Sequence, residues 1–135
     1  MRLYLDASAI IYAIEGVAPF RDSVVARIAQ AEGVPGGIVI TSRLSRLECR
    51  VKTLREGNAE VLAKFDGFFS KRQVSLSEIS PAVVERATEL RARYAFKTPD
   101  AIHLASAIEE QADLFLTGDT DLGRCVEVTV EVLTP

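Results

Sequence analysis

The chain has few of the residues that could cross-link a fold covalently or hold a structural zinc ion. Its 135 residues include only two cysteines, Cys49 and Cys125, which are far apart and belong to no CxxC pair. Two isolated cysteines cannot form a zinc site by themselves. We therefore expect two small buried thiols in a reducing compartment.

Long hydrophobic runs are also lacking. No apolar stretch is long enough to cross a bilayer, and Met1 and Arg2 lead directly into a short apolar segment without the pattern of a secretory leader. No internal repeat, low-complexity tract or linker divides the sequence. We expect a single domain over residues 1–135 in the cytoplasm, with no membrane partner.

An excess of positive charge is missing as well. The formal net charge is −3, which does not by itself indicate nucleic-acid binding. Basic residues are nevertheless concentrated in one segment, where Arg43, Arg46 and Arg50 share a face of a predicted helix. They could form an ordinary solvated face or steer phosphate groups, because an acidic site can hide a basic segment in the overall charge.

Strands alternate with helices along the sequence. Helices are predicted where Ser, Asn or Pro begins a segment and Gly often ends it. The expected helices are Ala7–Glu15, Pro19–Glu32, Ser42–Glu56, Asn58 to about Lys71, Ser80 to about Tyr94, and Thr98 to about Ala112. The expected strands are Leu3–Asp6, Ile38–Thr41, Val74–Ile79, Leu114–Leu116 and one in the valine-rich tail. This order predicts an α/β fold, a three-layer α/β/α sandwich with a mostly parallel central sheet of four to five strands.

Four acidic residues stand at the ends or margins of apolar segments. Asp6 ends the first strand, Asp119 follows the fourth, and Asp100 lies in the first turn of a helix. Glu48 lies at the margin of the apolar stripe that Leu44, Leu47, Val51 and Leu54 form on their helix. The carboxyl ends of parallel strands meet at one edge of a sheet, so Asp6 and Asp119 should lie there together. Acids gathered from distant segments repel one another unless a cation such as magnesium or manganese lies among them.

Each acid also has an ordinary structural explanation. Glu48 could form a salt bridge at a helix boundary, and Asp100 could be favoured by the helix dipole. Asp119 could form a turn, and Asp121 could serve as a ligand beside it or in its place. Asp6 is the hardest to explain in this way, because a strand that begins a sheet is usually central and buried.

Taken together, four segments resemble the PIN-domain ribonucleases, and among these the VapC-type toxins of toxin–antitoxin pairs. The segments are Tyr4-Leu5-Asp6-Ala7-Ser8, the arginine-flanked Glu48, Pro99-Asp100-Ala101-Ile102-His103-Leu104-Ala105, and Thr117-Gly118-Asp119. The resemblance covers essentially the whole chain in order, and the segment around Asp100 is its most specific part.

The resemblance implies a PIN-like fold and a site. Its catalytic and metal-binding residues would be Asp6, Glu48, Asp100 and Asp119, with Asp121 open as a further or alternative metal ligand, around one or two Mg²⁺ or Mn²⁺ ions. Ser8 and Thr117 would support the ligands from behind. The substrate would be RNA, the partner an antitoxin protein, and the chain would form a homodimer.

Two further features carry open alternatives. The only histidine, His103, lies one turn after Asp100 and could be an acid or base, although a structural hydrogen-bonding role is favoured. Phe65, Phe68 and Phe69 are expected to pack in the core. The alternative is a hydrophobic face for a second copy or an antitoxin helix.

Rival functions differ in the residues that they require. A haloacid dehalogenase-type phosphatase needs a second Asp two residues after Asp6, where this chain has Ser8, and a late Lys, but none follows Lys97. A receiver domain needs a pair of adjacent acids after its first strand and a late Lys, and this chain has neither. A PIN-like module that binds RNA or protein without cutting would carry the same residues, so the sequence does not distinguish it from a ribonuclease. The sequence therefore favours a metal-dependent endoribonuclease that hydrolyses RNA phosphodiester bonds, with the binding module as the alternative.

Overall fold

The computed structural model describes all residues 1–135 as alternating strands and helices. The elements in chain order are β1 (Arg2–Leu5), α1 (Ala7–Glu15), α2 (Phe20–Glu32), β2 (Ile38–Ser42), α3 (Arg43–Glu56), α4 (Ala59–Phe69), β3 (Val74–Ser77), α5 (Pro81–Tyr94), α6 (Thr98–Glu109), β4 (Leu114–Thr117), the 3-10 helix η1 (Thr120–Arg124) and β5 (Val130–Val132). The predicted helices and strands are all present, with ends that differ by a few residues. Only η1 was not expected, because short 3-10 turns leave no hydrophobic period to read.

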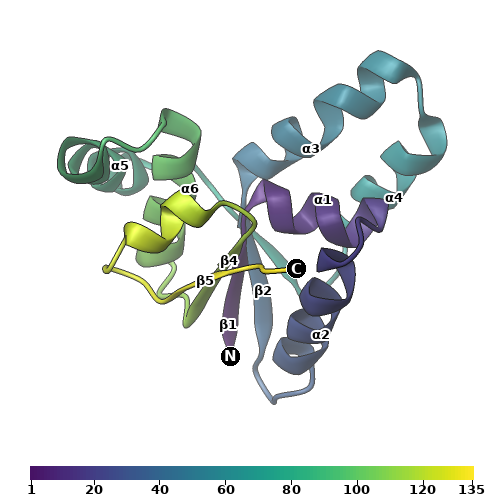
Figure 1. Cartoon of the computed structure of the whole chain (residues 1–135), viewed down its shortest axis with the longest axis horizontal. Coiled ribbons are helices and arrows are strands. Elements are labelled where there is room, and N and C mark those ends of the chain that lie inside the picture. The colour runs from purple at the N-terminus through teal and green to yellow at the C-terminus, as the bar shows by residue number, and fades with distance from the viewer.

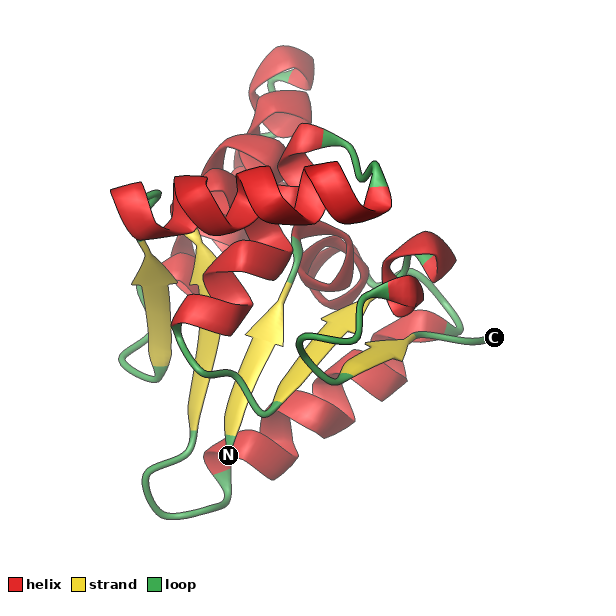
Figure 2. Ribbon diagram, turned by 90° about the vertical axis from the view of Figure 1, so that its left-hand side faces the viewer, coloured by secondary structure: helices red, strands yellow, loops and turns green.

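The five strands form one parallel sheet in the order β3-β2-β1-β4-β5. Figure 2 shows them side by side with their arrowheads at the same end. β1 is central, and its Leu5 pairs in register with Leu116 of β4. Asp6, which follows β1, and Thr117, the last residue of β4, therefore lie next to each other at the carboxyl edge. This confirms the predicted parallel sheet and the shared edge.

Helices cover both faces of the sheet, as Figure 1 shows, with α1, α2 and α4 on one side and α5 and α6 on the other. Successive side chains of β1 point to opposite faces. Leu3 and Leu5 join the core under α1, α2 and α4, whereas Tyr4 joins the core under α5 and α6. The predicted three-layer sandwich is confirmed.

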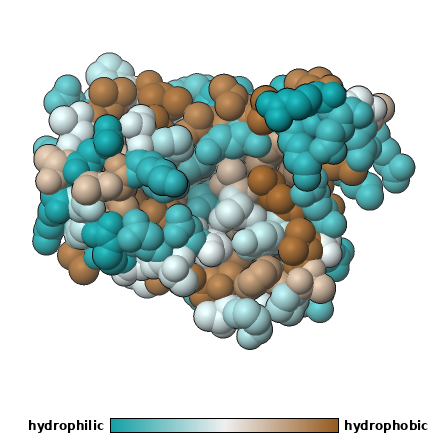
Figure 3. Space-filling view, turned by 45° about the horizontal axis from the view of Figure 1, so that its top comes forward, coloured by the Kyte–Doolittle hydropathy of each residue, from teal (hydrophilic) through white to brown (hydrophobic).

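The apolar stripe predicted on α3 does not face this core. Leu47, Val51 and Leu54 are 63%, 46% and 57% exposed, and the buried residues of α3 are small or polar: Ser45, Cys49 and Thr53. Figure 3 shows hydrophobic residues at the surface beside hydrophilic ones on this side of the molecule. α3 packs against α1 and β2 through small side chains, and its apolar stripe is left toward solvent.

The other predictions about the interior hold. Phe65, Phe68 and Phe69 are buried in the core, which confirms the packing role. Both cysteines are buried and free, and burial raises the pKa of the Cys125 thiol to about 11. None of the helices has the length and apolar character needed to cross a membrane.

Candidate active site

Asp6 is held at the carboxyl end of β1 by donors from α1 and from β4. It caps α1, and its Oδ1 accepts hydrogen bonds from the Ala9 backbone N–H at 3.1 Å and from the Ser8 hydroxyl at 2.6 Å. Its Oδ2 accepts a hydrogen bond from the Thr117 hydroxyl. Asp6 is only 5% exposed, so its carboxylate depends on hydrogen-bond donors of the protein rather than on water. The three donors supply these bonds and hold the carboxylate in one orientation.

The two hydroxyls also bind the loop after β4. The Ser8 hydroxyl accepts a hydrogen bond from the Gly118 N–H at 2.9 Å, and the Thr117 hydroxyl accepts one from the Asp119 N–H at 3.0 Å. Both residues thus join Asp6 to the start of the Asp119 loop. The predicted supporting positions contact the carboxylate that they were expected to support.

Asp100 lies in the first turn of α6 and is half-buried beside the other acids. Burial raises the pKa of its carboxyl, and the charges of Asp119, Asp6 and Glu48 raise it further, while His103 acts in the opposite direction. Because these charges act over short range, the four carboxylates, two from helices (α3 and α6) and two from strand ends (β1 and β4), lie near one another at one edge of the sheet.

Glu48 reaches this edge from α3 through the only histidine. Its Oε1 lies 2.6 Å from His103 Nε2, and His103 Nδ1 lies 2.8 Å from the Tyr4 hydroxyl. His103 and Tyr4 are 2% and 0% exposed. Burial raises the pKa of the Tyr4 phenol well above its ordinary value, so the phenol keeps its proton. The predicted structural hydrogen bonding of His103 is present, and its partner is a candidate ligand.

Asp119 and Asp121 have different surroundings. Asp119 caps η1 by accepting a hydrogen bond from the Asp121 N–H at 2.9 Å. The Asp121 carboxylate is held at both oxygens by Arg124, which lowers the pKa of Asp121. Asp100 is influenced by Asp119 and not by Asp121. This geometry favours Asp119 of the two as the fourth ligand.

Gly118 is needed for a close approach between α1 and the loop after β4. A Cβ added there would lie 2.6 Å from Cε2 of the Tyr12 ring, which no side chain can tolerate. Tyr12 in turn stacks on Phe20. Glycine therefore lets the loop after β4 lie against α1, and this contact positions the segment that carries Asp119.

The carboxylates do not form a closed cage. No group of three or more His, Cys, Asp or Glu side chains is spaced as a finished metal site. Asp6 and Glu48 accept hydrogen bonds within the chain, whereas Asp100 experiences repulsion from the rest. All of the oxygens are of the hard type that magnesium and manganese prefer over the nitrogen and sulfur favoured by zinc. The donor chemistry and the repulsion fit a divalent cation.

The predicted RNA-binding arginines are engaged in ion pairs. Arg43 pairs with Glu78, whereas Arg46 and Arg50 both approach Asp66 of α4, at 3.7 and 2.8 Å. Their face of α3 thus points toward α4, and Glu48 points toward α6. Lys97, by contrast, is exposed, makes no ion pair and is close enough to Asp121 to lower its pKa.

Sequence reasoning missed the partner of the histidine. Tyr4 was read only as part of an apolar strand. One signal could have identified it, since Tyr4 must point to the opposite face of β1 from Leu3 and Leu5, the face that another layer of helices covers. Lys97 was not considered for the site, although it lies three residues before Asp100 in the sequence.

The chain was compared with known proteins at the level of sequence family and of fold. A family model described as PIN domain matches residues 3–127. No curated protein matches the chain by sequence.

Several solved structures share the fold at low sequence identity. VapBC2 from Rickettsia felis, bound to a DNA fragment from its promoter, superposes with a TM-score of 0.77 at 17% identity, over 99% of this chain and 100% of that one. A toxin–antitoxin complex from Klebsiella pneumoniae gives 0.72 at 21% identity, covering 94% and 95%. VapC20 of Mycobacterium tuberculosis, a sarcin–ricin loop cleaving toxin, gives 0.70 at 16% identity, covering 94% and 98%. The fold is therefore that of these structures over nearly the whole length of each chain.

Proposed function

The chain belongs to the PIN-domain family, and we propose that its acidic edge is the active site of a metal-dependent endoribonuclease, the toxin of a toxin–antitoxin pair. One observation carries the proposal. The pKa of Asp100 is raised by burial and by the charges of Asp119, Asp6 and Glu48. Placing several carboxylates close together destabilises a fold, because their charges repel one another. A divalent cation bound among them would offset this repulsion.

The surroundings of each acid suggest a different role in the proposed site. Asp6 and Asp100 are proposed as the main ligands, with Glu48 and Asp119 completing the set. One or two Mg²⁺ or Mn²⁺ ions held there would activate a water and offset charge on the phosphoryl oxygens. Ser8 and Thr117 keep Asp6 in one orientation through their hydroxyls. Glu48 has one oxygen bound by His103 and the other without a hydrogen bond within the chain, free to orient the water.

The RNA backbone needs cations beside the carboxylates. Lys97 supports this role best, because it is unpaired and stands directly before α6, the helix that carries Asp100. Arg43, Arg46 and Arg50 remain candidates for the flanking RNA, although they would first have to leave Glu78 and Asp66. Phosphate contacts of this kind set affinity without reading sequence.

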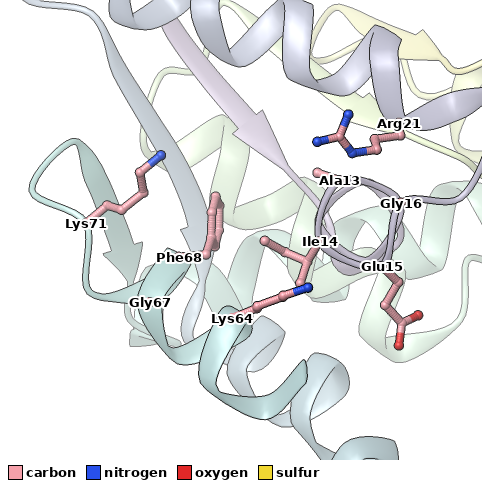
Figure 4. Close-up of a pocket in the computed structure, with 9 residues that line it drawn as sticks. All are labelled: Ala13, Ile14, Glu15, Gly16, Arg21, Lys64, Gly67, Phe68 and Lys71. Carbon is pink, nitrogen blue, oxygen red and sulfur yellow. The ribbon is translucent and has the colours of Figure 1, made fainter. Parts of the chain in front are cut away.

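The antitoxin is proposed to occupy a groove of about 590 Å³ between α1 and α4. Figure 4 shows Ile14 and Phe68 at its centre, with Arg21, Lys64 and Lys71 around them. Three cations around an apolar floor suit a segment that carries hydrophobic residues with acidic neighbours. The toxin–antitoxin complex from Klebsiella pneumoniae shares the fold, which supports a partner of this class.

A second copy of the chain is proposed to cover the exposed stripe of α3. Leu47, Val51 and Leu54 line an apolar groove that continues to Ile79. Leu47, Val51 and Leu54 repeat along one face of α3, and Ile79 lies beside them, which suits the self-matching contact of a twofold dimer. Leu47→Lys should shift the chain to the monomer in light scattering, with Val84→Lys on α5 as the exposed control.

An RNA cleavage assay tests the function and separates it from binding without cutting. Cleavage is expected with Mg²⁺ or Mn²⁺, and loss of cleavage in EDTA, in Asp6→Asn and in Asp100→Asn. The family match removes the phosphatase alternative, and Ser8 stands hydrogen-bonded to Asp6 where that chemistry needs an acid. RNA binding that persists without any metal-dependent cleavage would establish the binding module instead.

A further inference from the structure

A buried hydrogen-bond relay connects the centre of the sheet to Glu48. The Tyr4 hydroxyl lies 2.8 Å from His103 Nδ1, and His103 Nε2 lies 2.6 Å from Glu48 Oε1. The relay passes from β1 through α6 to α3, three elements that are far apart in sequence. His103 has no exposed edge for substrate, since its side chain is 3% exposed, whereas the Glu48 side chain is 28% exposed.

The Tyr4 ring is held in place by its packing against neighbouring aromatic rings. Its ring stacks on Phe115 of β4 with centroids 5.1 Å apart, and it meets the His103 ring edge-on at 5.9 Å. It is fully buried at the central strand. The phenol oxygen is therefore a rigid reference point, and the imidazole is oriented by the sheet itself.

For a neutral imidazole, the donors in the relay have one consistent arrangement. A carboxylate only accepts hydrogen bonds, so the proton between His103 and Glu48 is on Nε2. Nδ1 then accepts, and the single hydroxyl hydrogen of Tyr4 points to it. The result is a directed chain, from Tyr4 O–H to Nδ1 and from Nε2–H to Glu48 Oε1.

We propose that His103 is a positioning residue, which holds Glu48 through Nε2–H so that the other oxygen of Glu48 faces the carboxylate cluster. This inference rests on the proposed cation site. Asp100 and His103 are three residues apart on one face of α6. The helix therefore places Asp100 in the carboxylate cluster directly and holds Glu48 there through the His103 imidazole. A long glutamate side chain would otherwise sample many rotamers. His103 itself transfers no proton to substrate and holds no metal.

Two substitutions separate positioning from packing. The amide nitrogen of Gln lies close to the place of Nε2, so His103→Gln keeps the donor to Glu48. The amide of Asn lies close to the place of Nδ1, so His103→Asn faces Tyr4 and loses Glu48. Both remove the ring from the same buried site, and we expect both to lower the melting temperature by similar amounts.

Mn²⁺ titration by calorimetry gives the first readout. His103→Gln is expected to bind Mn²⁺ within about threefold of the wild type, and His103→Asn about 10–100-fold more weakly. With RNA, His103→Asn should lower kcat while leaving KM nearly unchanged, because RNA contacts are elsewhere. Equal Mn²⁺ affinities for the two variants, at equal melting temperatures, would show a purely structural histidine and overturn the proposal.

The tautomer of the single histidine gives a readout that needs no metal. His103 is the only histidine, so a long-range ¹H–¹⁵N spectrum of the metal-free protein reports it alone. We expect the Nε2–H form in the wild type and also in Tyr4→Phe, because the Glu48 carboxylate still accepts from Nε2. The Nδ1–H form in the wild type would contradict the relay. If the wild type binds no Mn²⁺, the proposed cation site fails, and this spectrum still decides whether His103 holds Glu48.

Discussion

Thr117, the last residue of β4, donates a hydrogen bond to the carboxylate of Asp6, the residue after β1, across 111 positions of sequence. The bond joins the ends of two neighbouring parallel strands. Together with the Ser8 hydroxyl and the Ala9 N–H, it gives Asp6 three donors within a buried setting. Asp6 therefore contributes to stability as well as to the proposed chemistry, which distinguishes it from the other acids.

Asp6→Asn should destabilise the fold. The amide has one acceptor oxygen where the carboxylate has two, and its NH₂ group would face a donor. A buried hydrogen-bonding group left without a partner costs about 1–3 kcal/mol, and we expect the free energy of unfolding in urea to fall by that amount. Asp119→Asn is the matched control, because Asp119 is exposed and its amide can still cap η1. Equal stability of the two variants would contradict this role of Asp6.

Asp100→Asn should do the opposite. Its half-buried carboxyl is destabilised by burial and by neighbouring negative charge, so the neutral amide removes an unfavourable term. We expect a melting temperature in EDTA at pH 7 that is equal to or above that of the wild type, with loss of cleavage. A clearly lower melting temperature in EDTA would mean that Asp100 is a structural acid.

The stability of the metal-free protein should depend on pH through Asp100. Its folded-state pKa is raised, so the folded state holds the proton more tightly than the unfolded chain. The contribution of Asp100 to stability is therefore most favourable below its ordinary pKa of 3.8, falls as pH rises toward the raised value, and stays low above it. Urea titrations of wild type and Asp100→Asn at several pH values measure this difference. A difference that does not change with pH would contradict the assigned shift.

Gly118→Ala should disturb the loop that carries Asp119. The new Cβ would overlap the Tyr12 ring, and overpacking of this kind costs about 1–3 kcal/mol. The double variant with Tyr12→Ala should recover part of this loss, which a double-mutant cycle in urea detects. Gly67→Ala in α4 is the control, since nothing lies within 4 Å of its added Cβ, and it should be neutral or stabilising. Strict additivity of the two changes would rule out the proposed overlap.

Lys97→Gln should weaken RNA binding and flatten its dependence on salt. Loss of one phosphate contact to a single strand lowers the slope of log K against log salt by roughly 0.7. Arg72→Gln is the control, because Arg72 is also exposed and unpaired but precedes β3, at the opposite edge of the sheet. The same slope for wild type and Lys97→Gln in fluorescence anisotropy would remove Lys97 from the RNA path.

Most of the fold could be predicted because its signals are local. Ser42, Asn58 and Ser80 cap the helices that they were expected to begin, and short apolar runs became the buried parallel strands. The position of Asp6 and Asp119 at one edge followed from strand direction alone. These features depend on neighbouring residues and on general rules of sheet geometry.

The orientation of α3 could not be predicted in the same way. Its outward Leu47 and inward Cys49 depend on how closely α1 approaches, which no local pattern records. The partner choices of Arg50 and His103 were hidden for a similar reason. Arg50 meets Asp66, and His103 meets Tyr4, only after two separate elements have packed together. The sequence therefore showed the charges and the ring but not their contacts.

A crystal structure of the protein soaked with Mn²⁺ tests the central claim most directly. We predict anomalous density for one or two Mn²⁺ ions at the carboxyl edge of the sheet, in contact with oxygens of Asp6 and Asp100 and with Glu48 and Asp119 around them. The claim would be contradicted if the edge held no ion at saturating Mn²⁺ and the four carboxylates turned toward separate regions of solvent.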